Sequence, residues 1–588
     1  MTPFRFAALA VALTLVLSAC GKSEEPASAA STADPAAHAL LAHVPADTPY
    51  LAANLEPVPE DVLEMFLERL QPALDQAQSE LSAALKESPA GASDDADRSE
   101  GHARLSLAVL REFDGKLSRS GLESLGLDLR AQQLFYGMGA FPVFRMSLGD
   151  PGALRDTVQR ILDNAGIEAP EREMDGRSYW RLSDDTQDHA PVGIYVSILD
   201  DHLALGVMPL ADESTLLPAF LGLELPAEND ALNVLTELNR REGYSNHGSG
   251  FVDFHRLADQ FLQADTSLAR LMSTEGDFDI SIRSEECVEE IHAIIDNAPR
   301  MTMGATELTT DAVAYRYRVE TPRTLASELL GLVARIPAAE AATSRILELS
   351  FGMRFGAARE FLREKFTAVV ENPYACEALH DLNQSAETTL AQLNQPLPPF
   401  VNNFRGLRLS LDELPMQEDS IPADARGHLA VHVEKPEMFV GMAQMFLPDL
   451  SSINLVAGDP PVRLPASLIP VPGVVAHAAM SSDAIGLAVG EGEETGLPDF
   501  LDRAAGPEGA FLTASYDMAA YLDYTDRLGR RMQAYGLEES AYEVEGDHAV
   551  MRIAEAGQAA VSEMMDRSYT TLRFDPEGFL IEGRVTFK

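Results

Sequence analysis

Three cysteines, Cys20, Cys287 and Cys376, are the residues of this 588-residue chain best suited to covalent chemistry. Cys287 and Cys376 each lie where a helical pattern begins. In an oxidising compartment, two such residues form either one disulfide or a pair of buried free thiols. We expect the disulfide, because closing a long loop would restrict the unfolded chain and stabilise the fold.

The first twenty residues have the pattern of an export signal. Arg5 supplies one positive charge, Phe6–Val16 is an uncharged apolar run, and small residues follow before Cys20. This order is typical of a secretory signal peptide. The run is too short for a transmembrane helix, which needs about 20 apolar residues. The remaining alternative is an ordinary secretory signal with an incidental cysteine.

The sequence Leu17-Ser18-Ala19-Cys20 resembles the lipobox of bacterial lipoproteins. That resemblance implies cleavage before Cys20 and attachment of acyl chains such as palmitate, through a diacylglycerol on its sulfur. Several acyl chains anchor durably, since each buried methylene adds about 0.8 kcal/mol. Residue 21 is glycine rather than aspartate, which by resemblance to enterobacterial sorting implies the periplasmic face of the outer membrane. Cys20 is therefore the expected contact with the membrane.

The chain is strongly acidic, with a formal net charge of −47, and only six of its 45 basic residues are lysine. Such a surface repels nucleic acid and anionic head groups, so we expect no nucleic-acid partner. A solvated surface adapted to salt explains the charge best, although a specific acidic binding face would give the same composition.

The sequence lacks the common catalytic motifs. It contains no Gly-x-Ser-x-Gly, Ser-x-x-Lys, His-Glu-x-x-His, phosphate-binding Gly-x-x-x-x-Gly-Lys or Cys-x-x-Cys pattern. The glycine-rich segment Gly490–Glu494 is acidic and would repel a phosphate, so we interpret it as a loop. We therefore predict no catalytic residue and no cofactor, while an enzyme site assembled from distant residues remains possible.

Two groups of residues resemble metal ligands only weakly. His428 and His432 share one face of a predicted strand, but their Cα atoms would be about 13 Å apart, too far to share one ion easily. Asp277 and Asp279 offer oxygen ligands at alternate positions, without the glycine and distal glutamate of an EF-hand loop. We predict no metal site and expect both histidines to be core or surface residues.

One helical pattern is unusually rich in methionine. Met438, Met442 and Met445 are spaced as one stripe of a helix, which could grip an apolar ligand. Packing of an amphipathic helix against the core is the simpler interpretation. Trp180, the single tryptophan, is likewise expected in the core.

The order of predicted elements occurs twice, near 134–320 and near 404–588. Each copy has a strand, a helix opened by proline (Pro151 or Pro436), a β-hairpin, a helix, a further strand and helix, and a closing hairpin. We interpret this as an internal duplication, with chance similarity of two α+β stretches as the alternative.

These patterns predict an α+β protein with two similar domains, each an antiparallel sheet with helices on one face. The expected divisions are a signal peptide at 1–19, a flexible tether at 20–39, a first repeat at 40–322, a helical connector at 323–398 and a second repeat at 399–588.

The segment Val44–Tyr50 resembles the opening of large uncharacterised periplasmic lipoproteins of Gram-negative bacteria, which implies no activity. Our leading hypothesis is a non-enzymatic protein that binds an unknown envelope protein or ligand, and it predicts an apolar patch without a polar cleft. A carrier of lipid or another hydrophobic ligand would instead have an apolar cavity within one sheet-and-helix layer. An envelope enzyme would have a cleft with contacting titratable groups.

Overall fold

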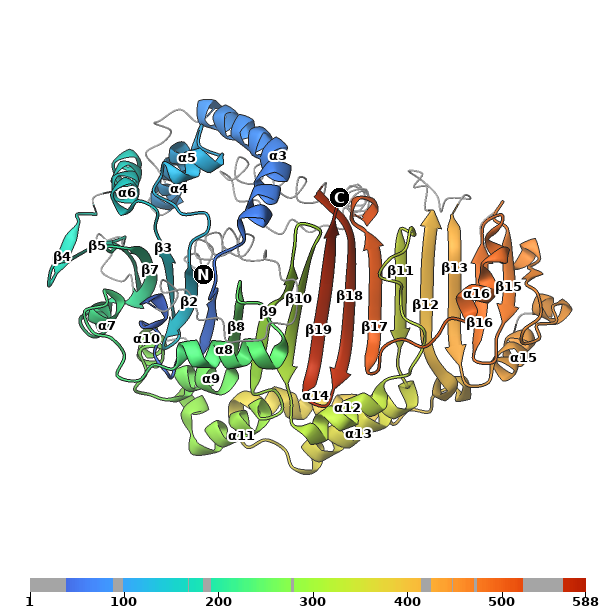
Figure 1. Ribbon diagram of the computed structural model, residues 1–588. Helices are drawn as coiled ribbons and strands as arrows, with labels where there is room; N and C mark the ends of the chain where they lie inside the picture. The colour runs from blue at the N-terminus through green and yellow to red at the C-terminus, as the bar shows by residue number, and fades with distance from the viewer. Residues whose placement is uncertain are drawn as a thin grey trace.

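The computed structural model describes residues 39–87, 99–167, 169–182, 192–275, 280–413, 425–446, 448–469, 473–521 and 564–588 (Figure 1). The signal peptide with Cys20, most of the tether, and Asp277 and Asp279 lie outside these residues. The fold is α+β, built on a large antiparallel sheet. In the part of the chain that is described, no helix is both long and apolar enough to cross a membrane.

The nineteen strands of the described residues join one sheet, in which neighbouring strands run antiparallel. The strands of the first half of the chain are β1 (Tyr50–Ala53), β2 (Gln133–Met138), β3 (Phe141–Ser147), β4 (Arg172–Met174), β5 (Arg177–Arg181), β6 (Val192–Ile198), β7 (His202–Pro209), β8 (Ser249–Asp253), β9 (Arg300–Leu308) and β10 (Ala312–Glu320). Those of the second half are β11 (Leu347–Gly352), β12 (Phe404–Glu413), β13 (Arg426–Val433), β14 (Val462–Arg463), β15 (Ala476–Met480), β16 (Ala484–Val489), β17 (Ala510–Asp517), β18 (Met565–Asp575) and β19 (Gly578–Phe587).

The two halves pair their strands in the same order. In the first half the order across the sheet is β6-β7-β3-β2-β1-β8-β9-β10. In the second half it is β15-β16-β13-β12-β11-β17-β18-β19. The last strands of the two halves, β10 and β19, pair along their whole length, from Ala312 with Thr586 to Glu320 with Gly578. One continuous sheet results, which runs across the whole view of Figure 1.

Helices surround this sheet. The first half contributes α3 (Glu60–Glu87), α4 (Ser99–Phe113), α5 (Arg119–Glu123), α6 (Pro151–Ala165), α7 (Glu213–Phe220), α8 (Ala231–Glu242), α9 (Phe254–Leu262), α10 (Ser267–Glu275) and α11 (Glu285–Ile295). The second half contributes α12 (Arg323–Leu332), α13 (Phe355–Glu371), α14 (His380–Leu393), α15 (Pro436–Phe446) and α16 (Leu497–Leu501). In Figure 1, α12–α14 lie beside one end of the central strands of the sheet.

The proline-opened helix of the first half begins where the sequence predicts. The Asp150 carboxylate caps α6 by accepting hydrogen bonds from the backbone N–H groups of Gly152 and Ala153, at 2.9 and 3.0 Å. Gly166 ends the helix in the left-handed conformation, with φ of 65°. These local signals explain why this element could be predicted without tertiary information.

Helices cover both faces of the sheet, so the expectation of helices on one face is wrong. On β6 and β7, α6 packs against Val196 and Leu205, whereas α7 packs against Tyr195 and Ala204 on the opposite face. Strands with apolar residues at successive positions need cover on both sides. Glycine allows the close approach on the second face, because a Cβ at Gly206 would meet the Phe220 ring of α7 at 2.9 Å.

The expectation that residues 323–398 form a purely helical connector is also wrong. β11 lies inside this segment and pairs with β12 on one side and β17 on the other. It escapes detection because its polar side chains point inward: Glu348 and Ser350 are buried, while Leu347 and Leu349 are half-buried. The single strand expected at the start of the first copy is instead the β2–β3 hairpin, which turns at Gly139 with φ of 59°.

The disulfide expected from the sequence is present and ties the two halves together. Cys287 lies on α11 of the first half, and its partner Cys376 lies between α13 and α14 of the second. Beside the bond, the Glu290 carboxylate accepts hydrogen bonds from the backbone N–H groups of Ala375 and Cys376, at 2.8 and 2.9 Å. Covalent and polar contacts therefore fix α11 to the α13–α14 pair.

Candidate functional site

An apolar cavity lies between the sheet and α15 in the second half. Its floor is formed by one face of the sheet, with Leu429 and Val431 of β13 and Ile485 and Leu487 of β16. Alternation along each strand places these side chains on the same face. The cavity volume is about 210 Å³, and all of the side chains that line it are apolar.

The helix above the floor is apolar on nearly all sides. Phe439, Val440 and Ala443 of α15 point into the cavity, and the segment after α15 adds Leu450 and Ile453. Further lining comes from Leu455, Leu464 and Ala478. The Gln444 amide holds this roof together by donating hydrogen bonds to the carbonyl oxygens of Leu450 and Ile453, at 3.2 and 3.1 Å.

The methionine stripe does not pack into the core, so that sequence interpretation is wrong. Met438 is 40% exposed and Met445 is 80% exposed, while Met442 is half-buried. Because α15 carries two apolar stripes, periodicity alone could not decide which one faces the sheet. In the structure, the stripe that contains Phe439 and Ala443 faces the sheet.

In the first half, side chains fill the equivalent layer between the sheet and α6. In register, Phe144, Leu205, Val196 and Trp180 form a row across β3, β7, β6 and β5. The corresponding row of the second half is Leu429, Leu487, Ala478 and Val462. Trp180 is 1% exposed and packs with Leu154 and Leu162 of α6, as expected for a core tryptophan. Smaller residues at the equivalent positions, Val462 and Ala478, leave space in the second half.

A space with this lining favours an apolar occupant. A cavity of about 150 Å³ lined by Leu, Ile and Phe stays dry and binds benzene. None of the side chains that line this cavity can form a hydrogen bond with water, so we infer that it suits a hydrocarbon group.

Filling the cavity should stabilise the ligand-free protein. We expect Ala443→Phe to raise the free energy of unfolding by about 1–2 kcal/mol, because the new ring would be buried in existing space. Urea unfolding checks this. Met445→Phe places the same ring on the exposed side of α15 and should leave stability unchanged. A loss of stability in Ala443→Phe would show that the space is not available.

A polar cluster occupies the opposite face of the same strands. Ligand atoms of Asp412, His428 and Glu493 all lie within 4.8 Å of one another. However, Arg426 pairs with Glu493 at 2.6 Å, and Arg345 lies 3.5 Å from Asp412. His428 Nε2 lies 2.8 Å from the carbonyl oxygen of Glu493, a contact in which the ring N–H donates. An arginine therefore lies beside each of the two carboxylates, and these charged groups form an ion network.

The two histidines considered as metal ligands make separate contacts. Both are buried on the same face of β13, as expected from their spacing. His428 stacks on Phe500 at a ring distance of 5.2 Å, whereas His432 faces Asp483, whose carboxylate is 3.8 Å away. They therefore act as separate core residues.

His432 should make the protein acid-sensitive. Burial, together with the nearby charge of Arg408, lowers the pKa of His432 to about 4. An unfolded chain, with a pKa near 6.5, binds the proton that the folded state excludes. This contribution to the free energy of unfolding is complete above pH 6.5 and is lost as the pH falls toward 4, by up to about 1.4 kcal/mol per pH unit.

Urea unfolding between pH 7 and pH 4 tests this dependence. His432→Gln removes the titrating ring, so the free energy of unfolding should fall less steeply in the variant than in the wild type. His380→Gln, which changes an exposed histidine, should keep the wild-type slope. Equal slopes in His432→Gln and the wild type would refute the prediction.

Of the other segments considered from the sequence, Gly490–Glu494 forms a loop leading into a short 3-10 helix, as predicted. Within the segment Val44–Tyr50, the residues Val44, Pro45, Ala46 and Thr48 line a second, smaller pocket beside α8. The residues of the apolar cavity were missed. The sequence signal that could have revealed them is a helix, α15, that is apolar on nearly all sides and packs on strands rich in alanine and glycine.

Comparison with protein-family models, curated proteins and solved structures finds no match for this chain.

Proposed function

We propose that this chain is a lipid-anchored envelope protein that carries an apolar ligand in the cavity beneath α15, without catalysing a reaction. The observation that carries this proposal is a cavity of about 210 Å³ with an entirely apolar lining. In the equivalent layer of the first half, Trp180 packs in the core instead.

The acyl chain of a lipid is the ligand class that fits best. A lining without hydrogen-bond donors or acceptors in its side chains suits a hydrocarbon and leaves a polar head group outside. A protein anchored at a membrane also lies next to a supply of such chains. The strongly acidic composition, with a net charge of −47, argues against nucleic acid as a partner.

The anchor and location rest on the sequence. The lipobox-like residues Leu17–Cys20 support lipidation at Cys20, and Gly21 supports the periplasmic face of the outer membrane. Residues 20–39 would then tether the body to the membrane. Cys20→Ala should abolish the incorporation of radiolabelled palmitate, and continued labelling would contradict the assignment.

We also infer that the body arose by duplication of one α+β domain. The identical pairing order of the two halves supports this, and so does the register between β10 and β19. Tyr317 of β10 pairs with Ile581 of β19, and Tyr315 of β10 pairs with Gly583 of β19. Two copies of one strand that pair across a two-fold interface have this kind of self-complementary register. Duplication would provide two similar layers, of which one became a cavity.

Native mass spectrometry of the exported Cys20→Ala chain tests the carrier function, because this form lacks the anchor acyl chains. We expect a bound molecule with an acyl chain on this protein and its loss in the additional variant Ala443→Phe. The same ring at the exposed position, Met445→Phe, should retain the molecule. Absence of any bound lipid, or equal retention in all three proteins, would contradict the proposal.

A further inference from the structure

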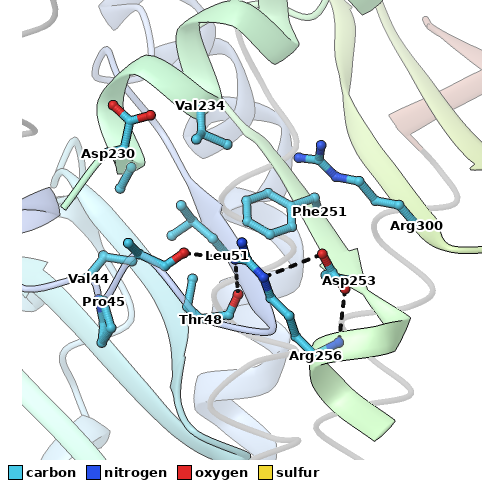
Figure 2. Close-up of a pocket in the computed structure, with 12 residues that line it drawn as sticks. Val44, Pro45, Thr48, Leu51, Asp230, Val234, Phe251, Asp253, Arg256 and Arg300 are labelled. Atoms are coloured by element: carbon cyan, nitrogen blue, oxygen red, sulfur yellow. Dashed lines mark hydrogen bonds and ion pairs between the residues drawn. The ribbon is translucent and has the colours of Figure 1, made fainter. Parts of the chain in front are cut away.

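A second pocket, of about 140 Å³, lies on the other half of the sheet beside α8 (Figure 2). Its walls include Val44, Leu51, Val234 and Phe251, which are apolar. The guanidinium of Arg300, at the start of β9, extends over the Phe251 ring, 4.4 Å from its centroid (Figure 2). The pocket thus combines apolar walls with charged side chains, and Arg300 is one of these.

Among the described residues, no carboxylate balances the charge of Arg300 through an ion pair. The Nε of Arg300 is buried without a hydrogen bond. Burial lowers the pKa of Arg300, with the nearby carboxylates of Glu320 and Asp253 opposing this effect. Both carboxylates are already used, because Glu320 pairs with Arg241 and Asp253 pairs with Arg256.

The other polar groups of the pocket are also occupied. Arg256 donates hydrogen bonds to the carbonyl oxygens of Ala46 and Thr48, at 2.8 and 3.1 Å. The Thr48 hydroxyl donates to a backbone carbonyl, and the Asp230 carboxylate accepts a hydrogen bond from Asn233. Arg300 is therefore the group with free donors.

We propose that this pocket binds the carboxylate of a small apolar acid, with Arg300 as the anchor for the carboxylate and Val234 and Phe251 enclosing the apolar part. A guanidinium binds a planar carboxylate through two parallel hydrogen bonds. Asp230 and Asp253 line the same pocket and would repel a dianion such as phosphate. The volume is close to that of a cavity that binds benzene, which limits the enclosed part to about six to eight non-hydrogen atoms.

Titration calorimetry of the full-length protein with isovalerate tests the proposal, with isovaleramide as its uncharged analogue. We expect saturable binding of one isovalerate per chain and at least tenfold weaker binding of the amide. Arg300→Gln should weaken isovalerate binding at least tenfold. Arg240→Gln, which changes an exposed arginine on α8, should bind like the wild type.

A second variant tests the pocket itself and keeps the charge. Val234→Phe fills the space beneath α8, so it should also lose isovalerate binding, while its circular dichroism spectrum should match that of the wild type. No saturable binding to the wild type would overturn the proposal. So would undiminished binding to a folded Arg300→Gln or Val234→Phe protein, equal affinity for the amide, or equally tight binding of inorganic phosphate.

Discussion

Replacing Cys287 and Cys376 together with alanine should lower the free energy of unfolding by about 4 kcal/mol. The disulfide joins residues 89 positions apart, and removing such a loop constraint from the unfolded chain costs about this much in the chain-entropy model. Alanine suits both positions, because each cysteine is buried.

The loss of stability should be greatest near the missing disulfide. Without the bond, α11 would be held to the α13–α14 loop mainly by the hydrogen bonds of Glu290 to Ala375 and Cys376. Amide hydrogen exchange should therefore increase first in α13 and α14. Urea unfolding with and without dithiothreitol provides the control, since the reductant should destabilise the wild type and leave the double variant unchanged. Equal stability of both proteins in non-reducing buffer would contradict the prediction.

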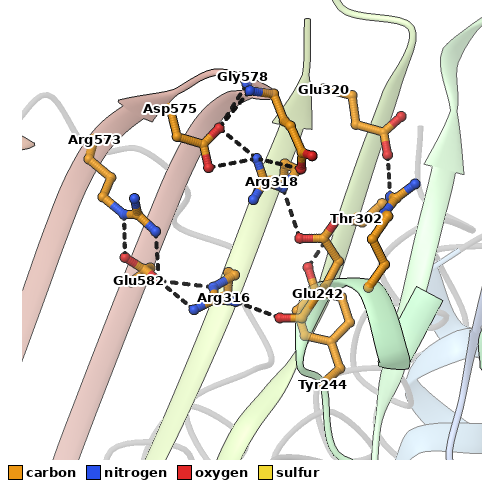
Figure 3. Close-up of polar contacts among 12 residues, drawn as sticks. Glu242, Tyr244, Thr302, Arg316, Arg318, Glu320, Arg573, Asp575, Gly578 and Glu582 are labelled. Carbon is orange, nitrogen blue, oxygen red and sulfur yellow. Dashed lines mark hydrogen bonds and ion pairs between the residues drawn. The ribbon is translucent and has the colours of Figure 1, made fainter. Parts of the chain in front are cut away.

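Arg318→Met should destabilise the protein by about 3–4 kcal/mol, because it would remove one of the two arginines, Arg318 and Arg241, that pair with the buried Glu242 carboxylate. The Arg318 side chain is 7% exposed and that of Glu242 is 1% exposed. Arg318 Nε donates to Glu242 at 2.8 Å, and another guanidinium nitrogen donates to both oxygens of Asp575 (Figure 3). This arginine connects α8, β10 and the β18–β19 turn, where the two halves meet.

Comparison with an exposed ion pair isolates the role of burial. Arg240→Met removes the partner of Glu237 on the outer side of α8 and should cause no measurable change. The double variant Arg318→Met/Glu242→Leu should regain part of the lost stability, because no buried charge remains on α8. Urea unfolding measures all three variants. A loss in Arg318→Met no greater than in Arg240→Met would show that the junction does not depend on this network.

Elements with local signals could be predicted from the sequence. The Asp150 cap and Gly166 stop define α6 within its own residues. The Asp575–Gly578 turn defines the final hairpin in the same way, with the Asp575 carboxylate accepting hydrogen bonds from the backbone of Glu577 and Gly578. In each case the decisive interaction is between neighbours in the chain.

Features that depend on distant partners could not be predicted. The inward-facing Glu348 made β11 look unlike a strand, and its burial is explained only by Arg345 and Arg503, which pair with it at 3.5 and 3.2 Å. The apolar cavity depends on the register of four strands, which places Ala478 opposite Leu487 and Val462 opposite Ala478. No local pattern carries that information.

The arginine pocket was missed for a similar reason. Arg300 is one of many arginines in the sequence, and its significance comes from what it lacks. Only the structure shows that Glu320 and Asp253 are each engaged by another arginine.

Calorimetric titration with n-butylbenzene is the most direct test of the central claim, that the space beneath α15 is a binding site for hydrocarbon. We expect saturable binding of one molecule per chain, at least tenfold weaker in Ala443→Phe and unchanged in Met445→Phe. Failure of the wild type to saturate, or equal affinity in Ala443→Phe, would contradict the claim.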